Sequence, residues 1–216
     1  MIFFENLKHP LIQAVAEVCR SANESVVDTS GHGGVQASLA KLGTPNGLVM
    51  CPPERCEAVA LNKALKHPED ALALGRDLHN DTMAFLQNCR AVTQAMMTAK
   101  AGQVLFVGID DVAARIVGQP ENPMANQLRV SALKSLAKEY GRMGIKYNTV
   151  LSQPSKESVE PQIWREKRDA LKVYTMRFSP NETTEYAQFC WSLLQGNVPV
   201  NGGIICLGKG VMEMAA

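Results

Sequence analysis

The sequence predicts an α/β fold in which parallel strands alternate with helices. Two apolar runs, GQVLFVGI at residues 102–109 and IKYNTVL at residues 145–151, have the length and the flanking glycines of buried strands. Between them, Pro123 suits the first turn of a helix, and Gly141 and Gly144 suit its end. A strand–helix–strand unit of this length is a crossover that joins parallel strands.

The first fifty residues show the same alternation. MIFF and SVVDTS are short apolar strands, and a helix that begins at Pro10 lies between them. This helix carries an apolar stripe formed by Leu11, Ala14, Val15 and Val18. Residues 31–45 then hold a single helix, VQASLAKLG, before a strand in NGLVMCPP. Residues 54–75 are helical in tendency, with an interruption at Pro68.

Two predicted helices carry more apolar surface than one face of a sheet requires. The helix over residues 123–140 has Leu128, Ala132 and Leu136 on a different face from Val130, Leu133 and Ala137. The helix over residues 76–100 has a core stripe formed by Leu78, Phe85, Cys89, Val92 and Met96. Its second face consists of small residues, Ala84, Ala91 and Ala95. Packing on a sheet needs one stripe, so we expect the second faces to contact another subunit. The alternative is an apolar but solvent-exposed helix surface.

The carboxyl-terminal third contains one charged segment, one helix and one strand. Residues 155–172 are highly charged, which favours a solvated helix and loop. SPNETTEYAQFCWSLLQG indicates a capped helix, and a last strand is expected over residues 203–208. The apolar tail after it, with Val211, Met212 and Met214, is expected to be an interface segment. With no linker or repeat, residues 1–216 are expected to form one domain.

Composition excludes several classes of function. A net charge of +1 gives no basic surface for nucleic acid, and no apolar run approaches the length of a membrane span. The amino terminus lacks a signal-peptide pattern, so we expect a cytoplasmic location. The six cysteines are expected to be reduced. Cys51 and Cys56 have no second pair at zinc-like spacing, so no metal site is expected.

The segment SLAKEYGRMGIKYNTV resembles the short-chain dehydrogenase/reductase family, and its ketoreductase branch in particular. The resemblance implies a three-layer, Rossmann-like, doubly wound parallel sheet, here shortened in the second crossover. In that family a strand ends in a catalytic Ser, a Tyr follows thirteen residues later, and a Lys four residues after that. The matching positions in this chain are Ile109, Asn122 and Asn126. The family's catalytic Asn matches Phe85.

The positions that bind the family's NAD(P) cofactor are also replaced. The three glycines of the dinucleotide turn match Asn6, Pro10 and Ile12. The family's Asn-Asn-Ala-Gly motif, which supports the cofactor, matches Met50, Cys51, Pro52 and Pro53. Glycines at the turn let the backbone approach a pyrophosphate, and side chains would fill that space. We therefore expect a degenerate member of the family that binds no cofactor itself.

Three functional hypotheses follow. The first is a non-catalytic subunit of a heteromeric short-chain dehydrogenase, paired with an intact NAD(P)-dependent subunit that acts on acyl-CoA or another acyl thioester. The pairing, in a tetramer, would use helices 76–100 and 123–140 and strand 203–208. The second is an enzyme in which Asp110 or Asp111 acts as an acid or base at the carboxyl end of a strand. The third is a stand-alone protein that binds a small molecule in the old cleft.

Overall fold

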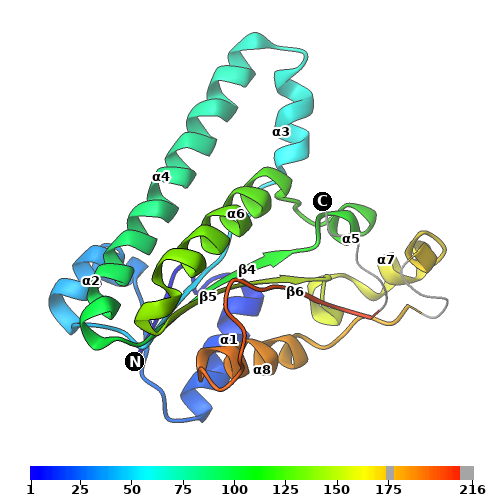
Figure 1. Cartoon of the computed structure of the whole chain (residues 1–216). Helices are drawn as coiled ribbons and strands as arrows, with labels where there is room; N and C mark the ends of the chain where they lie inside the picture. Colours follow the sequence, from blue (N-terminus) through cyan, green and yellow to red (C-terminus); the bar gives the residue numbers. More distant parts are fainter. Residues whose placement is uncertain (174–177, 210–216) are drawn as a thin grey trace.

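The centre of the fold is one parallel sheet of six strands in the order β2-β1-β3-β4-β5-β6 (Figure 1). The structure is a computed structural model that describes residues 1–173 and 178–209, so the predicted apolar tail lies outside the described residues. The strands are β1 (Ile2–Phe4), β2 (Val26–Asp28), β3 (Gly47–Met50), β4 (Gly102–Ile109), β5 (Ile145–Ser152) and β6 (Ile204–Leu207).

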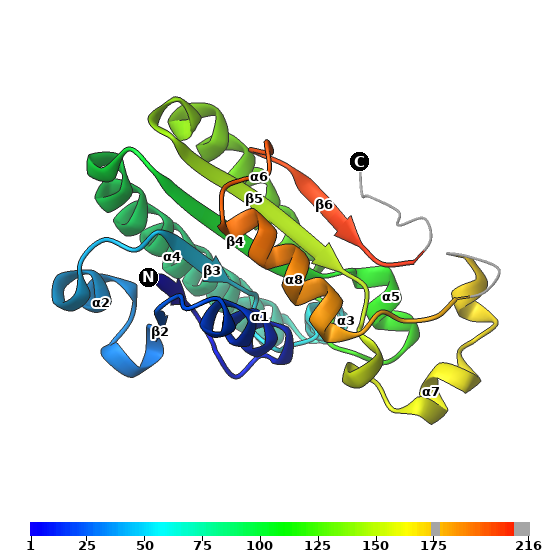
Figure 2. The same ribbon diagram turned by 90° about the horizontal axis from the view of Figure 1, so that it is seen from below.

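Helices cover both faces of this sheet (Figure 2). One apolar core lies between the sheet and α1 and α8, and a second lies between the sheet and α2, α4 and α6. The three-layer, doubly wound α/β fold expected from the sequence is therefore confirmed. The helices are α1 (Pro10–Ser21), α2 (Val35–Leu42), α3 (Glu57–Ala64), α4 (Pro68–Ala99), α5 (Asp111–Ile116), α6 (Pro123–Tyr140), α7 (Pro161–Glu166) and α8 (Thr183–Leu194).

The second crossover is shortened, as the sequence predicted. Between β2 and β3 the chain makes a short 3₁₀ turn and one helix, α2. A doubly wound dinucleotide-binding sheet has the order 3-2-1-4-5-6, with two strands beyond the first. Among the described residues, β2 is the single strand beyond β1. The described sheet therefore has one strand–helix pair fewer than that fold on this side.

The long helix begins earlier than the sequence pattern predicted. The expected helix over residues 76–100 is α4, which starts at Pro68 and ends at Ala99. Pro68 occupies the first turn, where its missing N–H and fixed φ are tolerated, so it begins this helix and does not interrupt one. α3 packs against α4 in a helical hairpin that extends beyond the sheet (Figure 1). The predicted core stripe is buried except at Leu78, which is half-buried.

An ion-pair cluster connects the base of this hairpin to the loop after β3. Arg55, in the loop between β3 and α3, lies 2.7 Å from Asp81 and 3.6 Å from Asp77, both on α4. The same guanidinium lies 3.5 Å from the Glu57 carboxylate, whose side chain is fully buried. A buried carboxylate requires such partners, because its isolated charge would be costly. The cluster therefore couples the position of α4 to that of the loop.

Two glycines provide opposite tests of this fold. Gly144 has a φ of +78°, and a Cβ there would collide with the Lys100 backbone oxygen, whereas a Cβ at Gly75 within α4 would meet nothing. We expect Gly144→Ala to lower the free energy of unfolding by at least about 1 kcal/mol, because an L-residue is disfavoured in left-handed backbone. We expect Gly75→Ala to raise it by about 0.5–1 kcal/mol through helix propensity. Urea denaturation measures both changes in the free energy of unfolding. Changes of the same sign would contradict the backbone conformations described for these two glycines.

Candidate functional site

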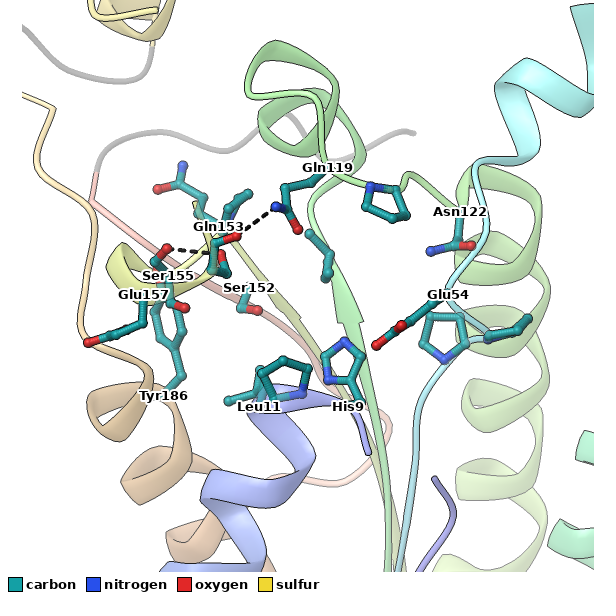
Figure 3. A pocket seen from close by; sticks show the side chains of 17 residues that line it. His9, Leu11, Glu54, Gln119, Asn122, Ser152, Gln153, Ser155, Glu157 and Tyr186 are labelled. Carbon is teal, nitrogen blue, oxygen red and sulfur yellow. Dashed lines mark hydrogen bonds between the residues drawn. The ribbon is translucent and has the colours of Figure 1, made fainter. Parts of the chain in front are cut away.

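A cleft of about 340 Å³ lies at the carboxyl edge of the sheet (Figure 3). Its walls come from the ends of β4 and β5, the turn between β1 and α1, the loop after β3 and the start of α8. Ligands of open parallel sheets bind at this edge, where the strand order reverses. Ile109, Pro10 and Asn122, three of the positions matched to family motifs, line this cleft together.

The turn between β1 and α1 forms the floor of the cleft. Asn6 matches the family's first glycine, and it adopts the left-handed conformation with a φ of 60°; Asn tolerates this region better than most residues. Pro10 is the first residue of α1 and supplies no N–H. His9 is 8% exposed, and its Nδ1 has no hydrogen-bond partner in the described chain. Burial lowers the pKa of this imidazole, so it is neutral near pH 7.

This lining does not suit a pyrophosphate. The side chains of His9, Pro10 and Leu11 lie where a glycine turn would expose backbone N–H groups. No lysine or arginine is among the described residues that line the cleft, and Glu54 and Glu157 add exposed carboxylates. A doubly charged phosphate group would therefore meet negative charge without a compensating cation.

The positions matched to the catalytic Tyr and Lys hold structural amides. Asn126 donates from Nδ2 to the Ile109 carbonyl oxygen at 2.9 Å and to Asp111 Oδ1 at 2.7 Å. With its amide nitrogen turned toward the loop after β3, Asn122 donates to the backbone oxygens of Arg55 at 2.6 Å and Pro53 at 3.2 Å. The structure therefore brings Ile109, Asn122 and Asn126 together. The amide nitrogens of Asn122 and Asn126 donate to neighbouring parts of the chain, whereas the buried Asn126 Oδ1 has no hydrogen-bond partner in the described chain. None of the three side chains is a proton-transfer acid near neutral pH.

Two carboxylates satisfy the amino end of α6. Glu57 Oε2 accepts hydrogen bonds from the backbone nitrogens of Met124 and Ala125, each at 3.1 Å. Asp111 Oδ1 accepts from the backbone nitrogen of Asn122 at 3.2 Å. Negative charge at a helix amino terminus is favourable, because the first N–H groups lack partners within the helix. Sequence analysis did not find this role for Glu57, since the two segments are far apart in the chain.

Asp110 and Asp111 do not line the cleft. Asp110 caps α5, and its Oδ1 accepts from the Ala113 nitrogen at 2.7 Å. Asp111 is held by Asn122 and Asn126, and burial raises the pKa of its carboxyl to about 6. The predicted pair thus lies at the carboxyl end of β4, as expected, but both groups form helix-end hydrogen bonds.

Of the remaining matched positions, Pro52 and Pro53 also line the cleft, and five others lie away from it. Asn6, Cys51 and Phe85 line a smaller cavity of about 180 Å³. The guanidinium of Arg129, from α6, lies 5.3 Å from the Phe85 ring centroid and faces the same cavity. The other two positions, Ile12 and Met50, are fully buried in the two cores. The matched positions are therefore divided between the cleft, this cavity and the core.

Two of the buried polar residues of the cleft, Tyr186 and His9, were not found from the sequence. Tyr186, in the first turns of α8, is 3% exposed, and its hydroxyl has no hydrogen-bond partner in the described chain. His9 is the second. His9 directly precedes an apolar helix, and Tyr186 lies among the apolar residues of another, so the local sequence pattern indicated packing alone. The feature of the sequence that could have identified them is a hydrogen-bonding side chain within a segment expected to face the core.

The described residues give no indication of a metal centre or a membrane span. Residues 1–173 and 178–209 contain no group of three or more His, Cys, Asp or Glu side chains placed to hold a metal ion. In the same part of the chain, no helix combines the length and the apolar character that crossing a membrane requires. The candidate site is thus the cleft at the sheet edge.

Comparisons with known proteins identify the fold. No protein-family model and no curated protein matches the chain. Among solved structures, HheC, a halohydrin dehalogenase bound to ethyl (2S)-oxiran-2-ylacetate, is 17% identical with a TM-score of 0.72, covering 100% of this chain and 98% of that one. A short chain dehydrogenase/reductase family protein is 14% identical with a TM-score of 0.68, covering 97% and 96%.

A gluconate 5-dehydrogenase from Burkholderia cenocepacia, in complex with NADP and tartrate, is 16% identical with a TM-score of 0.60, covering 96% of this chain and 93% of that one. The similar structures thus include a dehydrogenase and a dehalogenase. Both cover nearly the whole of this chain, so the likeness extends over all six strands. The chain therefore has the short-chain dehydrogenase/reductase fold, as the resemblance of its sequence implied.

The raised pKa of Asp111 predicts a pH dependence of stability. The unfolded chain ionises this group near pH 4, whereas the folded chain holds the proton up to about pH 6. The folded state therefore binds more protons in this window, so the contribution of Asp111 lowers the free energy of unfolding as pH rises through it.

Asp111→Asn keeps an oxygen that can accept both hydrogen bonds and cannot ionise. After allowing for partial solvent exposure, we expect the variant to be more stable than the parent chain by about 1 kcal/mol at pH 7 and equally stable near pH 4. Urea denaturation between pH 4 and pH 8 measures the difference. A difference that stays constant across this range would contradict the assigned pKa shift.

Proposed function

We propose that this chain is a non-catalytic subunit of a heteromeric short-chain dehydrogenase. Its partner is a homologous subunit that retains the family's Ser, Tyr and Lys and binds NAD(P). The observation that carries this proposal is the use of Asn122 and Asn126, at the positions matched to Tyr and Lys, as structural hydrogen-bond donors. A proton-transfer site needs a group with a pKa near the working pH, and amides lack one.

The outer surfaces of α4 and α6 support a paired assembly. Met83 and Leu86 on α4 are 41% and 42% exposed, and Leu128 on α6 is 36% exposed. The two helices lie side by side on one face of the sheet, and Arg129 of α6 reaches over Phe85 of α4 at this level (Figure 1). In the family that the sequence resembles, these helices form a four-helix bundle across a dimer axis. Exposed apolar residues at this position favour such a contact.

The edge strand β6 supports a second contact. Within the described chain, Ile204–Leu207 pairs with β5 on one side, and its opposite side has no neighbouring strand. All four of its residues are half-buried. In the resembling family this strand pairs across a second dimer axis. Two contact surfaces, at the helices and at β6, suit a tetramer with two-fold symmetry.

The cofactor and the reaction belong to the partner in this proposal. The resemblance suggests an acyl-CoA or another acyl thioester as the substrate of the complex. This chain would stabilise the partner and shape its substrate site. Acid–base chemistry at Asp110 or Asp111 has less support, because both carboxylates cap helices and lie outside the cleft lining.

Native mass spectrometry of the complex isolated from its own cells tests the proposal. We expect a mixed oligomer containing a homologous subunit with intact catalytic motifs. On titration with NADH, the number of nucleotides bound should equal the number of partner copies. A homo-oligomer that binds one nucleotide per chain would overturn the proposal.

Substitutions on the helix surface test the interface. We expect the double variant Met83→Glu, Leu86→Glu to lose the mixed oligomer, because the interface would bury two charges without partners. Leu65→Glu is the matched control, since Leu65 is apolar and 78% exposed but lies on the hairpin outside the proposed contact. Co-expression with the partner, followed by native mass spectrometry and circular dichroism, measures assembly and folding separately. Equal assembly of the double variant and the control would contradict this interface.

A further inference from the structure

Three buried hydrogen-bonding groups of the cleft have no partner in the described chain. They are His9 Nδ1, from the turn before α1, Gln153 Nε2, after β5, and the Tyr186 hydroxyl, from α8. All three side chains are more than nine-tenths buried, and Figure 3 shows them at the cleft. His9 Nδ1 and the Tyr186 hydroxyl come from different elements that face the cleft. Leaving a buried polar group unpaired is destabilising, because the group loses its hydrogen bonds to water. Native interiors rarely retain two such groups in one place without a ligand or water that satisfies them.

Much of the cleft wall is apolar and rigid, although serine and amide side chains also line it. Five prolines contribute to the lining, from the turns at the ends of β1, β3, β5 and the segment before α6: Pro10, Pro52, Pro53, Pro120 and Pro154. Because proline fixes its own φ, these turns have few alternative conformations. Ile109 and Leu11 extend the apolar surface. A preformed, mostly apolar cavity with a few polar groups is the usual form of a small-molecule site.

The charges of the cleft exclude most ionised ligands. No lysine or arginine is among its described lining residues, and the carboxylates of Glu54 and Glu157 repel an anion. Both of these side chains are exposed, so water screens their attraction for a cation, which would itself lose hydration on entering the cleft. Burial lowers the pKa of His9 and raises that of Tyr186, so each stays uncharged near pH 7. The interior therefore favours neutral groups.

We propose that this cleft binds an uncharged molecule about the size of a substituted benzene ring, with an apolar body and hydrogen-bonding groups at two positions. One polar group pairs with the Tyr186 hydroxyl and the other with His9 Nδ1. The apolar body packs between the prolines. This inference concerns the isolated chain and does not depend on the proposed pairing with a catalytic subunit.

Three compounds that differ chiefly in charge test the proposal. They are para-hydroxybenzamide, which is neutral, para-hydroxybenzoate, which is an anion, and para-hydroxybenzylamine, which is a cation. We expect the amide to bind saturably at pH 7, and chemical-shift titration of the labelled chain measures this binding. We expect the two ions to bind at least tenfold more weakly. Binding of either ion as tightly as the amide, or no saturable binding of the amide, would overturn the proposal.

The variant Tyr186→Phe locates the site. Loss of one hydrogen bond should weaken binding of the amide about three- to tenfold. The substitution removes an unpaired buried hydroxyl, so the melting temperature should stay the same or rise. Tyr140→Phe, at the far end of α6 and outside the cleft lining, is the matched control. Unchanged affinity in Tyr186→Phe, or an equal loss in both variants, would refute the assignment.

Discussion

The amino end of α6 depends on a buried carboxylate from another part of the chain. Pro123 supplies no N–H, and Glu57 accepts the hydrogen bonds of the next two backbone nitrogens. Glu57 is in turn positioned by Arg55, which is paired with Asp81 on α4. Hydrogen bonds and ion pairs therefore link three parts of the chain: the start of α6, the loop after β3 and the helical hairpin. Displacing any of them would leave a charge buried without its partner.

The same arrangement fixes the corner where Ile109, Asn122 and Asn126 meet. In a working proton-transfer site, an ionisable side chain must remain free to meet a substrate. Here Asn126 joins β4 to α6, and Asn122 joins α6 to the loop after β3. The hydrogen bonds that these amides make are internal to the chain. These hydrogen bonds stabilise the fold, and five prolines with a fixed φ line the adjoining cleft.

The sheet could be predicted from the sequence, whereas the polar contacts of the site could not. Parallel strands such as β4 and β5 are buried on both faces, so each appears as a continuous apolar run. The start of α4 was predicted too late because Pro68 suits both an interruption and a first turn. Glu57 and Tyr186 have roles set by residues distant in the sequence. Such roles depend on tertiary contacts, which hydrophobic periodicity does not report.

Both edges of the described sheet end in short strands. At one edge, β2 is three residues long, and it ends at Asp28, whose carboxylate accepts hydrogen bonds from Ser30. Very short strands are poor templates for pairing with another chain. At the opposite edge, the outermost strand β6 is four residues long. Edge strands this short offer few backbone groups to another chain, so the fold itself limits uncontrolled growth of the sheet by edge-to-edge pairing.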